Sequence, residues 1–221
     1  MAIAVGGGCK PKSPEEASCA EQAALVRGGV SETVQIETVP ASDEALTALS
    51  GLTELRTLLL DHSDSRVSAV GFVRLKGLGL VHLRYRGRGV DDEAATRIAE
   101  LKSLRILNLP QAEISNVGLG RLAELPELEQ LRLGGARVSI EGFKALAAMP
   151  GLKRLHLIDI PVGDAGLKVL GGIKQLESLY LDGAEVSEAA VDELFRVRPE
   201  LHVHFDQRHH DRDPSRHSHA P

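Results

Sequence analysis

LRILNL from Leu104 is the first of four copies of one phrase; the others are LEQLRL from Leu128, LKRLHL from Leu152 and LESLYL from Leu176. The copies start 24 residues apart, and a fixed period of this size is typical of a solenoid. Leucines at offsets 0, 3 and 5 end in a period of two, which predicts a short strand. Apolar residues at offsets 15, 18 and 21 step by three, which predicts a short helix.

Weaker copies extend the array in both directions. The complete set of starts is 31, 55, 80, 104, 128, 152, 176 and 200, which predicts eight strands, the last without a helix. Polar residues occupy the first position only at Ser31 and Glu200, as expected for edge coils. One unit cannot bury its own leucines, but stacked units can, with parallel strands about 4.8 Å apart and helices in an outer row.

The repeated phrase resembles the leucine-rich repeat family, in the short variety common in bacterial proteins, whose consensus is close to LxxLxLxxTxITDxGLxxLxxL. The resemblance covers Val30 to Phe205. It implies an α/β fold: a right-handed, horseshoe-shaped β/α solenoid with a parallel sheet on the concave side and helices on the convex side. Apolar residues replace the family's usual Asn or Thr after the strand, at Ala112, Ala136, Ile160 and Ala184. No side-chain ladder can form there, so backbone groups must bond one another or water, and we expect looser loops.

Four segments are expected along the chain. Residues 1–12 are a disordered segment or the remnant of a lipoprotein-type signal, and 13–29 form a capping helix that begins at Ser13 and ends at Gly28-Gly29. Residues 30–206 form the leucine-rich repeat domain, and 207–221 form a disordered, histidine-rich tail with no apolar residue to bury before Ala220. A loop at Asp61–Arg66 interrupts one repeat, and we interpret it as a tolerated bulge in preference to a contact surface.

The first residues, MAIAVGGGC, resemble the end of a bacterial lipoprotein signal, with Cys9 as the lipidated residue. The run lacks basic residues and is shorter than such signals, so either the start lies upstream or the segment is an ordinary N-terminus. The chain is accordingly expected in the cell envelope in the first case and in the cytoplasm in the second. Both cysteines, Cys9 and Cys19, precede the repeats, which excludes a disulfide framework within the array.

Composition narrows the function classes. A net charge of −5 argues against general nucleic-acid binding, and no segment approaches the roughly 18 apolar residues of a membrane span. No GxSxG, HExxH or CxxC phrase and no phosphate-binding loop is present, so we expect neither an enzyme nor a cofactor. We expect a monomer that binds a protein partner.

The concave face provides the candidate site. Strand residues at offsets 2 and 4 should face it, and these two rows contain arginines and histidines without one carboxylate, while acidic residues cluster at offset 6. The pattern favours a basic surface for an acidic partner, although any sheet that faces water must be polar. The candidate partner-binding residues are His82, Arg84, Asn108, Gln130, Arg132, Arg154, His156 and Tyr180.

Two alternatives to a binding module remain. The array could serve as a scaffold in an envelope lipoprotein. The histidine-rich tail, together with His202 and His204, could instead handle metal ions, since imidazoles bind zinc, nickel and copper. The tail shows no ordered ligand spacing, so the sequence assigns no metal site.

Overall fold

The computed structural model describes residues 14–135, 137–206 and 208–209. Eight strands pair in sequence order, all parallel, and a ninth short strand pairs antiparallel with the eighth. The strands are β1 (Thr33–Ile36), β2 (Thr57–Leu60), β3 (His82–Tyr85), β4 (Ile106–Leu109), β5 (Gln130–Gly134), β6 (Arg154–Ile158), β7 (Ser178–Asp182), β8 (His202–Phe205) and β9 (Arg208–His209). The expected eight-strand parallel array is confirmed.

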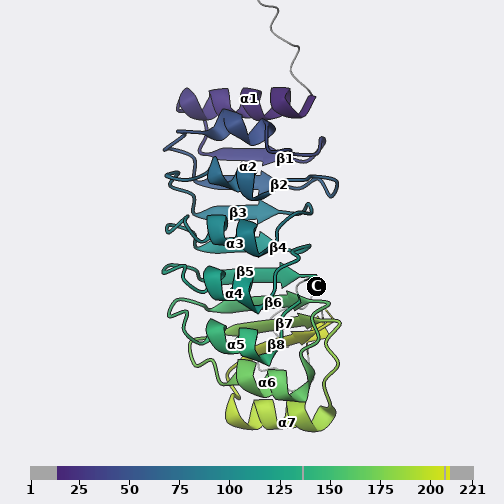
Figure 1. Cartoon of the computed structure of the whole chain (residues 1–221). Helices are drawn as coiled ribbons and strands as arrows, with labels where there is room; N and C mark the ends of the chain where they lie inside the picture. The colour runs from purple at the N-terminus through teal and green to yellow at the C-terminus, as the bar shows by residue number, and fades with distance from the viewer. Residues whose placement is uncertain (1–13, 136, 207, 210–221) are drawn as a thin grey trace, which may run out of the picture.

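One helical segment follows each of the first seven strands, and one helix precedes the array. They are α1 (Pro14–Arg27), the 3-10 helix η1 (Ala45–Leu49), α2 (Ala69–Val73), α3 (Asp92–Ile98), α4 (Asn116–Leu122), α5 (Ile140–Leu146), α6 (Gly163–Gly171) and α7 (Glu188–Val197). Figure 1 shows the helices stacked in a row along one side of the sheet, with α1 at one end and α7 at the other. We call one strand with the helix that follows it a coil.

The helix α1 lies across the first coil and packs against η1 and β1. Its buried residues Cys19 and Ala23 join the common core. The Gln22 side chain also bonds the free edge of β1: its Nε2 donates to the Gln35 carbonyl at 3.0 Å, and its Oε1 accepts from the Gln35 amide at 3.2 Å. These bonds satisfy backbone groups that an edge strand would otherwise leave unpaired. Ser13, the expected N-cap, and Cys9 lie outside the described residues.

The core consists of the repeated leucines. In the coil that starts at Leu104, that residue is 0% exposed and Leu107 and Leu109 are each 1% exposed. One continuous hydrophobic cluster extends from Cys19 to Val203, so the coils share a core. This organisation is the one that the 24-residue period predicts.

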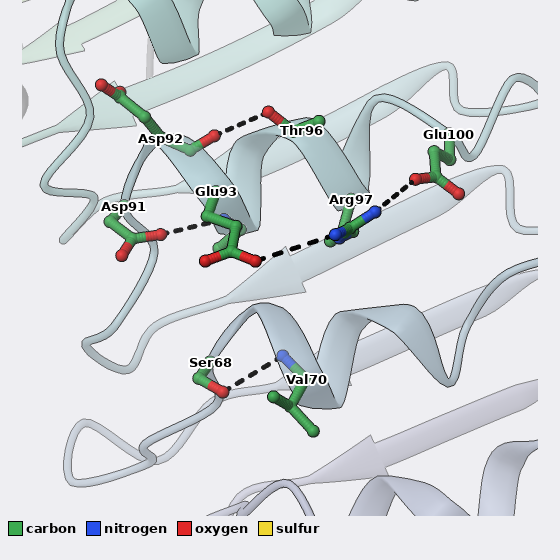
Figure 2. A network of polar contacts seen from close by, with 9 residues as sticks. Ser68, Val70, Asp91, Asp92, Glu93, Thr96, Arg97 and Glu100 are labelled. Atoms are coloured by element: carbon green, nitrogen blue, oxygen red, sulfur yellow. Dashed lines mark hydrogen bonds and ion pairs between the residues drawn. The ribbon is translucent and has the colours of Figure 1, made fainter.

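Side-chain N-caps stabilise the first turn of several helices. The Ser68 hydroxyl accepts a hydrogen bond from the Val70 amide at 3.2 Å, and the Asp91 carboxylate accepts from the Ala94 amide at 2.9 Å. Such N-caps satisfy backbone donors that the first helical turn leaves free. Figure 2 shows both caps and the ion pairs from Arg97 to Glu93 and Glu100 on α3.

Neighbouring coils are joined by a second set of polar contacts, which we call the inter-coil bridges. In each bridge the Asp or Asn at offset 12 of one coil accepts from the backbone amide of a Ser in the next coil and bonds that serine's hydroxyl. The bridges are Asp43–Ser68, Asp92–Ser115, Asn116–Ser139 and Asp164–Ser187, with distances of 2.6–2.9 Å. Two coils lack the bridging side chain. Ala69 occupies the equivalent position in the coil with the inserted loop, and Ile140 occupies offset 12 in the coil from Leu128; the serine position of the following coil is Asp91 or Gly163, respectively.

The bridge formed by Asp92 illustrates the close packing of adjacent coils. Its carboxylate lies on the side of α3 that faces away from α2 (Figure 2) and also accepts from the Gly118 amide at 3.0 Å. A Cβ at Gly118 would lie 2.3 Å from the Asp92 Oδ1, and one at Gly142 would lie 2.5 Å from the Asn116 Oδ1. The bridge oxygen therefore requires glycine at both positions.

Backbone hydrogen bonds join the loops of adjacent coils. As predicted, backbone groups of adjacent turns do bond one another: the Glu113 amide donates to the Val90 carbonyl at 2.8 Å, and the Arg137 amide to the Ile114 carbonyl at 2.7 Å. The apolar substituents Ala112 and Ile160 are each 1% exposed and so enlarge the core. The side-chain ladder is thus displaced toward the helices, where the inter-coil bridges hold the coils together.

The inserted loop at Asp61–Arg66 is built into the array. Ser65 is buried, and its hydroxyl accepts from the Ala41 amide at 2.8 Å. Tyr85, which occupies a leucine position, accepts from the Val67 amide at 2.8 Å and donates to the Arg88 carbonyl at 2.6 Å. Burial raises the pKa of Tyr85 to about 12, so its hydroxyl remains a donor at neutral pH. These contacts anchor the end of the loop to the neighbouring coils.

The tail departs from expectation at its beginning. Arg208 and His209 form β9, paired with Phe205 and His204 of β8, so the disorder expected from residue 207 onward is wrong for these two residues. A turn at Asp206, with a φ of 48°, reverses the chain. Residues 210–221 lie outside the described residues.

We predict that Leu155→Ala destabilises the protein by about 2–5 kcal/mol, because Leu155 is 0% exposed and the substitution leaves a cavity between coils. Chemical denaturation monitored by circular dichroism measures the change. Leu59→Ala is the matched control, since Leu59 projects from the concave face and is only partly buried. Equal losses for the two variants would contradict the assignment of core and surface rows.

A second prediction concerns the bridge at Asp92. Burial acts to raise the pKa of this carboxyl, but hydrogen bonds from Ser115 and Gly118 outweigh it and lower the pKa below the usual value. The stabilisation is therefore complete above the pKa of the unfolded chain and is lost as pH falls through the lowered folded pKa. Asp92→Ala should cost about 1–2 kcal/mol near neutral pH.

Asp92→Asn should recover much of that loss, because Asn116 forms the same bridge to Ser139. The asparagine cannot titrate, so the stability advantage of the wild type over Asp92→Asn should shrink from about pH 6 to about pH 3. Urea unfolding at both pH values tests this. A constant difference would mean that the bridge does not depend on the ionised carboxylate.

Candidate functional site

The strand register aligns the side chains of the candidate site in two straight rows, one at offset 2 and one at offset 4. One row pairs His82 with Ile106, Gln130 with Arg154, and Ser178 with His202 on adjacent strands. The other contains Arg84, Asn108, Arg132, His156, Tyr180 and His204 in successive strands. The sequence-predicted residues therefore share one face, opposite the buried leucines, but they do not all have the same surroundings.

The N-terminal end of this face is neutralised. Arg84 forms an ion pair with Asp61, an offset-6 carboxylate on the adjacent strand's end. Burial, and then the positive charge of Arg84, lower the pKa of His82 below its usual value, so His82 is neutral at pH 7. The positive charge of the predicted basic surface is therefore reduced at this end, because the acidic row lies close enough to pair with the basic one.

A polar and aromatic cluster occupies the C-terminal end. His156 Nε2 lies 2.9 Å from Asp182 Oδ2, and the Tyr180 ring lies between His156 and the last strand. Ring centroids of Tyr180 and His156 are 5.5 Å apart, and those of Tyr180 and His204 are 4.6 Å apart. The aspartate fixes the orientation of the imidazole, and the tyrosine presents a rigid aromatic surface.

Arg132 and Arg154 form the centre of the site and are both exposed. Among the described residues neither guanidinium has a carboxylate within ion-pair distance, unlike Arg84. They flank a shallow depression of about 270 Å³ over β4–β7. Its lining includes Ile106, Asn108, Gln130, Arg132, Arg154, His156 and Tyr180.

Asn108 gives this depression an unused acceptor. Its Oδ1 is buried and has no hydrogen-bond partner among the described residues. A buried polar atom without a partner costs free energy, which a bound donor or an ordered water would recover. The depression thus combines two exposed cations, a buried acceptor without a hydrogen-bond partner among the described residues, an apolar side chain at Ile106 and an aromatic ring.

Six of the eight predicted site residues line the depression, while His82 and Arg84 lie outside it. The predicted site did not include Ile106, which lies at offset 2 and lines the depression. Nor did the sequence analysis predict the ion pair between Asp61 and Arg84. The sequence pattern could have predicted such pairs, since acidic residues at offset 6 of one coil adjoin basic residues at offset 4 of the next or preceding coil.

Other kinds of site are not evident in the part of the chain that the structure describes. Within it, no three histidine, cysteine or carboxylate side chains are grouped so that they could hold a metal ion. None of the described helices combines the length and apolar character needed to cross a membrane.

The chain matches no family model, and no curated protein sequence is significantly similar to it. Solved structures are similar in fold. Internalin C2 of Listeria monocytogenes superposes with a TM-score of 0.61 at 19% sequence identity, covering 90% of this chain and 88% of that one. Another internalin from the same organism gives 0.57 at 21% identity, covering 84% of this chain and 59% of the other.

A leucine-rich repeat protein of Leptospira interrogans gives a TM-score of 0.55 at 20% identity, covering 83% of this chain and 51% of that protein. All three are bacterial leucine-rich repeat proteins. The repeats, the parallel sheet and these similarities establish that the chain has the leucine-rich repeat fold.

Proposed function

We propose that the protein is a non-catalytic interaction module that docks a protein partner on its concave face, over β4–β7. The observation that carries the proposal is the pair Arg132 and Arg154, which are exposed and have no ion-pair partner among the described residues, while Arg84 on the same face is neutralised. Cationic side chains maintained without a carboxylate partner suit a surface whose counter-charge comes from another molecule.

The partner that fits this surface is an acidic protein segment. Arg132 and Arg154 lie on the adjacent strands β5 and β6, so a single extended segment can place carboxylates against both. A guanidinium accepts a carboxylate through two parallel hydrogen bonds, which gives directional as well as electrostatic recognition. Binding would also provide a donor for Asn108 and contact with the Tyr180 ring, and tyrosine and arginine are enriched in protein interfaces.

A catalytic role for this site has less support than partner binding. His156 and Asp182 form a hydrogen-bonded pair that could act as a base, but a nucleophile must also lie within reach and water must be excluded. The depression is shallow and lies on an open sheet. Among the described residues, no comparable observation favours the scaffold hypothesis.

We predict that the double charge reversal Arg132→Glu with Arg154→Glu abolishes partner binding without loss of stability, because both side chains are exposed. The measurement is affinity capture from lysate of the source organism, followed by identification of proteins recovered by the wild type and missing with the variant. A captured acidic partner should also be released by salt, since exposed charge contacts are screened.

Arg74→Glu with Lys144→Glu is the matched control, because it changes the net charge equally at exposed positions near α2 and on α5. The control should capture the same partner as the wild type. Recovery of that partner by the concave-face variant would place the contact elsewhere and overturn the proposal.

A further inference from the structure

The last parallel strand has a pair of histidines whose rings meet. His202 and His204 are two residues apart on β8, so both side chains project from the concave face. Their Nε2 atoms lie 2.8 Å apart, and both residues are partly exposed. The pair adjoins the depression that contains Arg132 and Arg154, because the Tyr180 ring lines the depression and lies against both histidines.

We propose that His202 and His204 chelate a late first-row divalent metal ion, with Cu²⁺ as the preferred ion. Two nitrogens each about 2.0–2.1 Å from one ion, at a right angle, would be about 2.9 Å apart. The observed separation of 2.8 Å matches this spacing. Right-angled nitrogen ligands suit the tetragonal geometry of Cu²⁺ and Ni²⁺, and Cu²⁺ binds imidazole most tightly in the first-row series.

The surrounding structure holds both ligands in place. β8 pairs with β7, which sets His202 beside Ser178 and His204 beside Tyr180. The Tyr180 ring centroid is 4.6 Å from that of His204 and 5.8 Å from that of His202. On the opposite face of the strand Leu201 and Val203 are 0% exposed, so the strand cannot turn over. Ligands ordered before binding lose little entropy when the ion arrives.

Without metal, the 2.8 Å contact is a hydrogen bond in which one ring nitrogen donates and the other accepts. To bind the ion through both Nε2 atoms, the donor imidazole shifts its proton from Nε2 to Nδ1, so both rings stay neutral and each offers a lone pair. No third metal-binding side chain joins the pair among the described residues, so water or a donor from a docked molecule completes the coordination.

The test separates the pair from the tail. A tail variant of the full chain replaces His209, His210, His217 and His219 with glutamine. Calorimetric titration with CuCl₂ should give one ion per chain for this variant, with nitrogen hyperfine splitting in the electron paramagnetic resonance spectrum. Adding His202→Gln and His204→Gln should remove the binding and the splitting.

His82→Gln in the tail variant is the matched control, because His82 occupies the same row on β3, far along the sheet from β8, and should leave binding unchanged. Circular dichroism before titration verifies that each variant is folded. The single variant His204→Gln, which leaves β8 least altered, should also lose the ion. If the tail variant binds no Cu²⁺, or if the added pair substitutions leave its binding intact, the proposal is overturned.

Discussion

Burial of leucine between neighbouring coils is the interaction on which the rest of the structure depends. A coil has too few residues to enclose its own apolar side chains, so each coil covers the next, and the core is continuous from Cys19 to Val203. At each end of such an array, an apolar face and a strand edge have no neighbouring coil to cover them. At the N-terminal end α1 packs across the first coil and bonds the free edge of β1 through Gln22.

Stacking also determines where polar groups can lie. Coils in register bring the offset-12 carboxylate of one coil to the first helical turn of the next, where amides are unpaired. The bridges from Asp92 to Ser115 and from Asp164 to Ser187 use this geometry. Such bonds fix the spacing of the helices, and together with the sheet they hold the concave side chains in straight rows.

The concave face carries charge unevenly because its rows are so close together. Carboxylates at the strand ends reach the basic row at both sides of the array, where Asp61 pairs with Arg84 and Asp182 with His156. In the two rows at offsets 2 and 4, Arg132 and Arg154 at the centre are the arginines that are exposed and have no ion pair among the described residues. Tyr180 adjoins this centre and the histidines of β8, so one rigid face offers two different chemistries side by side.

The sequence by itself determined the fold, because a 24-residue leucine period has one economical solution and each strand and helix is encoded locally. It also determined which residues share the concave face, since strand alternation fixes side-chain direction. It did not determine the inter-coil bridges, the loss of free charge at Arg84, the unpaired Asn108 oxygen or the contact between His202 and His204. These depend on distances between side chains of different coils and on their rotamers. Such distances exist only after the coils have stacked, so the tertiary structure alone decided them.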